Sequence, residues 1–220
     1  MDKYTIIVAG GRGLRMESDI PKQFLLLAGK PVLMHTLEAF RSAIEGIQII
    51  LVLPSDQMET WESLVSKYAF EIDHRIVEGG ETRFDSVKNG LVFVSENGLV
   101  AIHDGVRPLV SKDVIIRSFE GAAALGNAIT TVALKESIRE VHQLGNKSVD
   151  RSAYRLVQTP QTFKSSLIKN AFANAEHSDF TDDAGVLEHD GVKINLIEGD
   201  YKNIKITTKE DLLFAASILT

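Results

Sequence analysis

Short runs of apolar residues alternate along the chain with segments whose apolar side chains recur at helical spacing. The apolar runs predict strands at residues 4–9, 47–53, 75–78, 99–103, 128–133 and 193–198. The helical spacing predicts helices at residues 31–44, 55–68, 82–94, 111–125 and 210–219. Because strands separated by helices form βαβ units, we expect an α/β fold with a Rossmann-like, mainly parallel sheet and helices on both faces.

Residues typical of helix ends support several of these boundaries. Ser111 before the fourth predicted helix and Gly126 after it suit an N-cap and a C-terminal stop. Ser55 and Asp56 predict a side-chain cap for the second helix, and residues 208–211 form a capping sequence for the last one.

Residues 135–159 break the alternation of strands and helices. Polar and apolar residues alternate through 136–141, a turn falls near Gly145, and the chain returns through 149–157, so we expect a protruding β-hairpin arm. Because an isolated hairpin is marginally stable in water, we expect the arm to pack against a second copy of the chain in a homodimer. The alternative is a solvated hairpin on its own domain. No repeat or linker interrupts the sequence, which predicts a single domain over residues 1–220.

Composition and charge narrow the class of protein. The chain has 220 residues, of which 44% are hydrophobic and 25% are charged, as in an ordinary globular domain. Its net charge of −6 argues against general nucleic-acid binding, so a phosphate site would have to concentrate its cations locally. No apolar run approaches the roughly 18 residues of a membrane helix. The first residues carry a strand pattern and no secretion signal. The sequence contains no cysteine. We therefore expect a cytoplasmic protein with no membrane partner, no disulfide and no thiolate metal site.

The stretch 9–16, Ala-Gly-Gly-Arg-Gly-Leu-Arg-Met, follows the first predicted strand, and Pro-Lys-Gln follows at 21–23. Glycines let backbone N–H groups approach phosphate oxygens, and Arg15 and Lys22 add positive charge, so the loop predicts a nucleotide-phosphate site. A Walker A loop would end in Gly-Lys-Ser/Thr, and a dinucleotide fingerprint needs glycine where Met16 stands, so both are excluded. A glycine-rich turn with surface cations is the plainer alternative.

Two further segments carry candidate chemistry just after predicted strands. Within residues 79–87, two glycines would let the chain approach a flat base, and Ser86 lies one turn into the next helix; a capped turn is the alternative. Asp104, at the end of the fourth predicted strand, can hold a divalent metal against phosphate oxygens, and Arg107 can bind a second phosphate. The alternative for Asp104 is a turn cap, and we interpret His103 as structural.

Two segments near the end of the chain are weak signals when taken alone. Residues 181–184, Thr-Asp-Asp-Ala, predict a helix N-cap with an acidic first turn. Residues 203–207 alternate like a strand and would display Lys205. Because ligands of parallel α/β sheets collect at the carboxyl ends of the strands, we expect all these segments to meet at one edge of the sheet.

Six motifs occur along the chain in a fixed order. They are Ala-Gly-Gly-x-Gly-x-Arg-Met with Pro-Lys-Gln, Gly-Gly-x-x-Arg-x-x-Ser-Val, His-Asp-x-x-Arg-Pro, Gln-Thr-Pro-Gln, Thr-Asp-Asp-Ala and Asn-Ile-Lys-Ile-Thr. From residue 6 to about residue 219 the sequence thereby resembles the 2-C-methyl-D-erythritol 4-phosphate cytidylyltransferase family. The resemblance implies a nucleotidyltransferase fold. It also implies an enzyme of the non-mevalonate isoprenoid pathway that joins CTP and 2-C-methyl-D-erythritol 4-phosphate into 4-diphosphocytidyl-2-C-methyl-D-erythritol and pyrophosphate.

The resemblance implies a role for each residue that matches a motif. The residues that would bind CTP are Ala9, Gly10, Gly11, Gly13, Gly80, Glu81 and Ser86. The catalytic cations would be Arg15 and Lys22, and Asp104 would hold a magnesium ion. The residues that would bind the acceptor phosphate and polyol are Asp104, Arg107, Ser137, Arg151, Thr159, Thr181 and Lys205. Arg151 would come from the arm of the dimer partner.

The sequence departs from the family pattern at a few positions. Gly105 and Val106 stand where many members have two alanines, Val8 stands where proline is frequent, and Ser137 stands where threonine is frequent. Valine at the position of Val106 also occurs in ribitol-5-phosphate cytidylyltransferases, which are the nearest alternative. The Thr-Asp-Asp-Ala and Arg-Phe-Asp-Ser-Val runs are more similar to the isoprenoid enzyme.

Two broader alternatives remain open at this level. A sugar-1-phosphate nucleotidyltransferase that uses UTP, GTP or ATP would have a similar opening loop. A non-catalytic nucleotide sensor would keep the fold but lose Arg15, Lys22 or Asp104, and the sequence retains all three.

Overall fold

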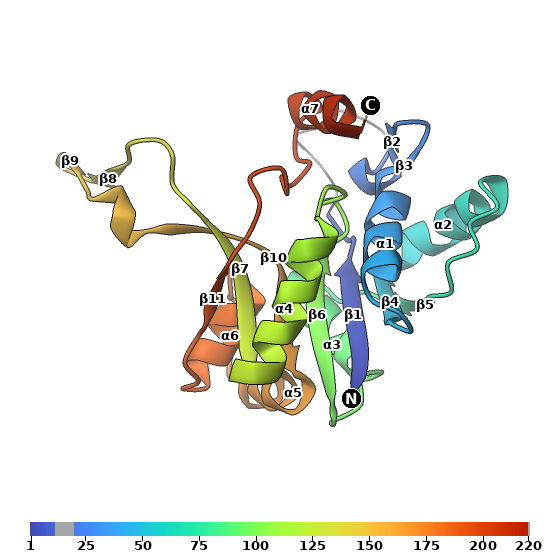
Figure 1. Cartoon of the computed structure of the whole chain (residues 1–220), viewed down its shortest axis with the longest axis horizontal. Helices are drawn as coiled ribbons and strands as arrows, with labels where there is room; N and C mark the ends of the chain where they lie inside the picture. The colour runs from blue at the N-terminus through green and yellow to red at the C-terminus, as the bar shows by residue number, and fades with distance from the viewer. Residues whose placement is uncertain (12–19, 220) are drawn as a thin grey trace.

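The computed structural model describes residues 1–11 and 20–219 and centres on a seven-stranded sheet (Figure 1). In chain order, the strands of this sheet are β1 (Asp2–Val8), β4 (Gln48–Leu53), β5 (Arg75–Glu78), β6 (Gly98–Asp104), β7 (Asn127–Ala133), β10 (Arg155–Lys164) and β11 (Leu196–Glu198). Their spatial order is β11-β7-β10-β6-β1-β4-β5. The neighbouring strands are parallel except where β10 pairs with β6 and β7, so the mainly parallel sheet is confirmed.

Successive residues of the central strands pack on opposite faces of the sheet, because side chains alternate along a strand. Ile6 and Val100 join the hydrophobic cluster on one face, whereas Ile7 and Ala101 join the cluster on the other. All residues of β6 are buried. Burial on both faces explains why these strands are continuous apolar runs in the sequence.

Helices cover both faces of the sheet, as the sequence predicts. The helices on the Ile7 face are α1 (Val32–Ala43), α2 (Ser55–Lys67) and α4 (Lys112–Leu125). The helices on the Ile6 face are α3 (Arg83–Leu91), α5 (Ser165–Asn174) and α6 (Asp183–His189). Leu37 and Trp61 pack in the first cluster and Val87 in the second, so the apolar face of each helix is buried against the sheet.

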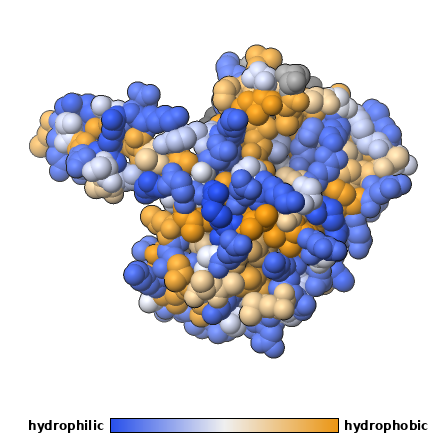
Figure 2. Space-filling view, in the orientation of Figure 1, coloured by the Kyte–Doolittle hydropathy of each residue, from blue (hydrophilic) through white to orange (hydrophobic). Residues whose placement is uncertain are grey.

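The last helix, α7 (Lys209–Leu219), packs away from the sheet. Beneath it lie short elements that follow the first loop: η2 (Lys22–Phe24), β2 (Leu26–Leu27) and β3 (Lys30–Pro31). Ala215 of α7 is buried in a small third cluster with Leu27 and Val106. Leu213 and Phe214 stay exposed, and an apolar area is visible at the place of α7 in Figure 2.

The predicted helix ends are partly confirmed. Ser111 caps α4 by accepting a hydrogen bond from the Val114 N–H, and Gly126 ends that helix with a positive φ of 94°. The side-chain cap predicted at Ser55 is wrong, because Ser55 is already helical. The N-cap position is occupied by Pro54, whose side chain makes no cap hydrogen bond.

Two parts of the strand prediction are wrong. The sequence suggests that 149–157 is the return of the arm, but β10 continues to Lys164 and lies antiparallel between β6 and β7. Pro160 interrupts the strand pattern, and the register of β10 shifts between Val157 and Gln161. Residues 203–207 form no strand. In this stretch the Ile206 N–H donates one backbone hydrogen bond to the Val106 carbonyl of the loop after β6, and no ladder of such bonds follows. Helix α5 is an addition that the sequence-based prediction omitted, whereas the helix N-cap predicted within residues 181–184 is confirmed, because Asp182 caps α6.

The arm contains the antiparallel pair β8 (Arg139–His142) and β9 (Gly145–Ser148), followed by the short helix η3 (Arg151–Ala153). It projects from the body of the protein at the left of Figure 1. Every residue of β8 and β9 is exposed. Among the helices of the described residues, none has both the length and the apolar character needed to cross a membrane.

Candidate active site at the carboxyl edge of the sheet

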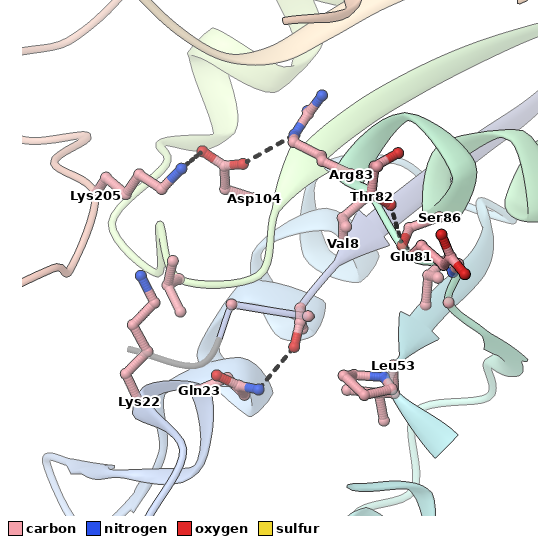
Figure 3. Close-up of a pocket in the computed structure, with 18 residues that line it drawn as sticks. Val8, Lys22, Gln23, Leu53, Glu81, Thr82, Arg83, Ser86, Asp104 and Lys205 are labelled. Atoms are coloured by element: carbon pink, nitrogen blue, oxygen red, sulfur yellow. Dashed lines mark hydrogen bonds and ion pairs between the residues drawn. The ribbon is translucent and has the colours of Figure 1, made fainter. Parts of the chain in front are cut away.

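The carboxyl ends of β1, β4, β5 and β6 border a cleft of about 320 Å³ (Figure 3). We call it the nucleotide-side cleft, because the sequence predicts a nucleotide-phosphate site at its glycine-rich loop. It is lined by this loop, by the turn that opens α3, and by charged side chains from three further segments. Its size suits a small ligand, and its position is where parallel α/β sheets bind ligands.

The first wall of the cleft is the start of the glycine-rich loop. The Gln23 side chain donates a hydrogen bond of 2.7 Å to the Ala9 carbonyl and so ties η2 to the end of β1. The Lys22 side chain lies along the loop, because a β-carbon built on Gly11 would lie 3.4 Å from Lys22 Cε and 3.8 Å from Lys22 Nζ. The glycine backbone and the Lys22 side chain therefore lie together on one side of the cleft.

The second wall is the turn between β5 and α3. Ser86 Oγ accepts a hydrogen bond from the Gly80 N–H at 3.1 Å and donates one to the Thr82 carbonyl at 2.9 Å. Thr82 and Asp85 form a capping box that fixes the start of the helix. A β-carbon at Gly80 would lie 2.2 Å from Asp85 Cβ, so only glycine lets the turn pack this closely on the helix.

Asp104, at the end of β6, is surrounded by cations. Its Oδ2 accepts a hydrogen bond from Arg107 Nε at 3.0 Å and lies 3.2 Å from Lys205 Nζ. Its Oδ1 lies 3.9 Å from Arg83 Nε. Burial by itself raises the pKa of the Asp104 carboxyl, but Lys205, Arg107 and Arg83 together hold the pKa well below its usual range. Asp104 is therefore a carboxylate throughout the physiological pH range.

A second cleft of about 250 Å³ shares Arg83, Asp104 and Lys205 with the first. We call it the acceptor-side cleft, because the family resemblance predicts that several of its residues bind the acceptor. Thr159 and Thr181 also line it. The two clefts thus adjoin at the Asp104 carboxylate, and the acceptor-side cleft is rich in cations. The arrangement can hold two anionic molecules next to each other.

His103 lies beneath Asp104 and is fully buried. Its Nε2 donates to the Arg107 carbonyl at 3.2 Å, so its Nδ1 accepts from the Thr159 hydroxyl at 3.0 Å, and Thr159 Oγ1 accepts from the Asp104 N–H at 3.1 Å. Burial lowers the pKa of His103 to about 3. The imidazole is neutral and fully hydrogen-bonded, which suits a structural role and no role as a general base.

The structure gathers most of the predicted site residues. The residues that line the nucleotide-side cleft are Ala9, Gly10, Gly11, Lys22, Gly80, Glu81, Ser86, Asp104 and Lys205. The residues that line the acceptor-side cleft are Asp104, Arg107, Thr159, Thr181 and Lys205. Ser137 and Arg151 lie on the arm, and neither is among the residues lining these two clefts. Gly13 and Arg15 lie outside the described residues.

The loop after Asp104 accounts for two departures from the family pattern. A β-carbon at Gly105 would lie 2.8 Å from Ala9 Cβ and 3.0 Å from Leu33 Cδ1, so glycine suits this close approach. Val106 lines the nucleotide-side cleft and packs with Leu27 and other residues of the third cluster. Val106 is not among the residues that line the acceptor-side cleft.

Two residues of this region had no role in the sequence-based prediction. Arg83 lines both clefts and forms a bidentate ion pair with Asp183, the first residue of α6. Both residues lie within recognised motifs, but the sequence offers no sign that they are partners. Their positions are 100 residues apart, so only the packing of α6 beside α3 reveals the pair.

An open, mainly parallel sheet, with a glycine-rich loop, clustered cations and two adjoining clefts at its carboxyl edge, is the arrangement expected of a nucleotidyltransferase of the α/β class. A profile of one family of this class, 2-C-methyl-D-erythritol 4-phosphate cytidylyltransferase, matches residues 4–220. The chain belongs to this family.

Individual relatives agree with this membership. The 2-C-methyl-D-erythritol 4-phosphate cytidylyltransferase of Bacteroides thetaiotaomicron is 50% identical over 219 residues, which cover 100% of each chain. The crystal structure of 4-diphosphocytidyl-2C-methyl-D-erythritol synthase from Anaerococcus prevotii has a TM-score of 0.84 at 30% identity, covering 99% of this chain and 96% of that one. The 2-C-methyl-D-erythritol 4-phosphate cytidylyltransferase structure from Francisella tularensis has a TM-score of 0.81 at 33% identity, covering 98% of each chain.

Proposed function

We propose that this chain joins CTP and 2-C-methyl-D-erythritol 4-phosphate to give 4-diphosphocytidyl-2-C-methyl-D-erythritol and pyrophosphate. The observation that carries the proposal is the junction of the two clefts at Asp104, where cations converge beside the glycine-rich loop. Family membership over residues 4–220 supports the choice of both substrates.

In this proposal the nucleotide-side cleft holds CTP. Gly10 and Gly11 offer backbone N–H groups to the phosphates, and Lys22 beside them adds a positive charge. Gly80 and Ser86, in the tight turn at the start of α3, would contact the cytosine and ribose. Glu81 lies in the same turn and lines the cleft, and we propose that it also contacts the ribose and the base.

The reaction would be nucleotidyl transfer. An oxygen of the acceptor phosphate attacks the α-phosphorus of CTP, a new P–O bond forms, the bond to the bridging oxygen of the β-phosphate breaks, and pyrophosphate leaves. The second pKa of a phosphomonoester is about 6, so the nucleophile is already mostly a dianion and needs no general base. The obstacle is the repulsion between two anions, which Lys22, Arg107 and Lys205 would offset.

A magnesium ion fits the chemistry of this site. Magnesium sites of this kind use one or two carboxylates together with substrate phosphates, and Asp104 is a permanently charged carboxylate at the junction of the clefts. Its Oδ1 lies 3.9 Å from Arg83 Nε, beyond hydrogen-bonding distance, and we assign this oxygen to the metal. Within residues 1–11 and 20–219, no group of three histidine, aspartate or glutamate side chains encloses a metal by itself. When bound, the ion would neutralise charge on the triphosphate.

A coupled pyrophosphate assay with CTP and magnesium tests the proposal. We expect pyrophosphate release with 2-C-methyl-D-erythritol 4-phosphate and at least about 10³-fold lower kcat/KM with ribitol 5-phosphate, equivalent to about 4 kcal/mol. UTP, GTP and ATP serve as control nucleotides in the same assay. Faster turnover of ribitol 5-phosphate would replace the proposed acceptor, and turnover with another nucleotide alone would replace CTP.

The pH dependence of the reaction should follow the acceptor phosphate and not the protein. Neither His103 nor Asp104 changes charge between about pH 5 and pH 8, because the pKa of each lies well below that range. We expect kcat/KM for the acceptor to fall below about pH 6 as the phosphate becomes a monoanion. A folded His103→Gln variant should keep the acid limb of the parent, and a shifted limb in that variant would contradict the prediction.

We further propose that the chain is a single nucleotidyltransferase domain over residues 1–220 and that its arm, residues 135–159, forms a homodimer. The arm exposes apolar side chains, including Val141, Leu144 and Tyr154, and a hairpin of this size gains stability only by packing on something. Arg151 donates a hydrogen bond to the Lys135 carbonyl within the arm. We assign Arg151, together with Ser137, to the acceptor-side cleft of the partner subunit. The absence of cysteine suits a cytoplasmic location.

Arg151→Ala should raise KM for the acceptor about tenfold to a hundredfold and leave CTP affinity within about twofold, because a charge-assisted hydrogen bond to phosphate is lost. Steady-state kinetics and titration calorimetry with CTP measure the two effects. Arg139→Ala is the matched control, since Arg139 lies on the same arm and bonds Asn146 within it. Loss of CTP binding in Arg151→Ala would show that the assignment is wrong.

Mixed dimers separate a shared site from a local one. A dimer of one Arg151→Ala chain and one Lys22→Ala chain holds one site that combines an intact Lys22 with an intact Arg151 from the partner. We expect the activity at low acceptor concentration to exceed the sum of the two separate variants when they are mixed under conditions that exchange subunits. Absence of this excess would contradict the shared site.

A further inference from the structure

Arg83 stands where the two clefts meet the covering helices. It is the first residue of α3, and its guanidinium binds Asp183 of α6 through two hydrogen bonds, of 2.9 Å to Oδ1 and 2.6 Å to Oδ2. On its other side, Arg83 faces Asp104 (Figure 3), and its Nε forms an ion pair with Asp104 Oδ1 at 3.9 Å. One side chain therefore connects the nucleotide-side helix, the acceptor-side helix and the carboxylate between them.

The ion pair is too buried to be explained as surface chemistry. The Asp183 side chain is 1% exposed, and the Arg83 side chain is 32% exposed. Burial raises the pKa of the Asp183 carboxyl more than the Arg83 guanidinium lowers it, so the charge on Asp183 is unfavourable without its partner. Buried ion pairs add little stability compared with apolar residues of the same volume, so stability alone is a poor reason for this pair.

The segment before α6 is also attached to the nucleotide side. Phe180 stacks on Phe84 of α3 with ring centroids 5.9 Å apart. Asp182, the N-cap of α6, accepts a hydrogen bond from the Gln161 side chain of β10 at 2.8 Å. Thr181 lies between these two anchors and lines the acceptor-side cleft. A shift of α3 when the nucleotide-side cleft fills would therefore be passed to Thr181.

We propose that Arg83 and Asp183 are positioning residues that couple the two substrate sites: they hold Asp104 and the Thr181 segment in register with the nucleotide-side cleft, so that filling one cleft favours filling the other. The inference rests on the proposed function. Arg107 and Lys205 hold Oδ2 of Asp104, while Arg83 faces Oδ1 at 3.9 Å as an ion pair without a hydrogen bond. Without Arg83, no cation among the described residues pairs with Oδ1, and the carboxylate is oriented by its Oδ2 contacts alone.

The test removes the pair without leaving a buried charge. Arg83→Met combined with Asp183→Leu replaces both charged groups with apolar ones, a change that buried ion pairs can tolerate. We expect kcat to fall about 10- to 100-fold with KM for CTP within about threefold, because small misplacements of reacting groups have effects of this size. Lys169→Met combined with Glu96→Leu is the matched control. Those two residues form a 2.7 Å ion pair between α5 and the turn that follows α3, and this pair is more exposed than the pair of Arg83 and Asp183.

Calorimetry measures the coupling itself, independently of turnover. In the parent enzyme, α,β-methylene-CTP, which cannot react, should tighten binding of the acceptor at least about fivefold. In the double variant this factor should fall below about twofold, whereas the control should keep it. The single variants Asp183→Asn and Arg83→Lys, which nearly preserve side-chain volume, are measured in the same way. If the double variant melts more than about 5 °C below the parent, the coupling factors of these single variants decide whether the coupling depends on the ion pair.

The outcomes are distinct. A folded variant whose turnover and coupling stay within twofold of the parent would overturn the inference and leave a structural ion pair. Absence of coupling in the parent would also overturn it. Failure of the proposed function would appear differently, as a parent enzyme that releases no pyrophosphate from CTP and 2-C-methyl-D-erythritol 4-phosphate.

Discussion

Lys22→Ala should lower turnover by about 10²–10³, or about 3–4 kcal/mol of transition-state stabilisation, while changing CTP affinity far less. Lys22 is buried at the side of the nucleotide-side cleft and runs along Gly11. In the proposed reaction, this ammonium group would stabilise the charge on the oxygens of the α-phosphate in the transition state, while the backbone N–H groups of the loop would bind the ground-state triphosphate. Steady-state kinetics together with calorimetry of CTP binding measure the two effects separately.

Lys30→Ala is the matched control for this variant. Lys30 lies on β3, near Lys22 in the sequence, and pairs with Glu38 outside the clefts. We expect that variant to keep the turnover of the parent. A Lys22→Ala enzyme whose only defect is a raised KM for CTP would show that Lys22 serves ground-state binding, and the catalytic assignment would fall.

Asp104→Asn should lower kcat by about 10² or more without raising KM for CTP or the acceptor. Asparagine keeps the shape of the side chain and can still accept hydrogen bonds from Arg107 and Lys205. Because a negative charge is removed from a cluster of cations, the clefts become more positive and should bind anions at least as well. The variant loses the carboxylate that we assign to magnesium, so its activity should also require more magnesium.

Kinetics at several magnesium concentrations test this prediction. Asp113→Asn, in the first turn of α4, is the control, because it removes an exposed carboxylate away from the clefts. An Asp104→Asn variant with the kcat of the parent and raised KM values would instead assign Asp104 to orienting the substrate-binding cations. A melting temperature close to that of the parent confirms that the effect is not one of folding.

The elements that could be predicted are those whose signal is local. The central strands are buried on both faces, so their apolar runs are continuous, and β5 begins and ends where the pattern predicts. The glycine-rich loop and Asp104 follow strands directly, so their meeting at one edge follows from the parallel sheet. The antiparallel strand β10 could not be predicted in the same way. Pro160 and its polar neighbours interrupt the apolar pattern of this strand, and its partners β6 and β7 precede it in the sequence by some distance.

The site shows the same division between local and distant signals. Motifs along the chain identify the residues that line each cleft, since short-range spacing sets which side chains follow each strand. Motif order does not indicate that Arg83 and Asp183 are partners, that Asp104 sits among three cations, or that the clefts share a wall. Those contacts join residues on different helices and loops, and they form only when both faces of the sheet are covered. Local periodicity thus predicted the α/β fold, and the motifs in their order indicated the family, whereas long-range packing decided how the two substrate clefts meet.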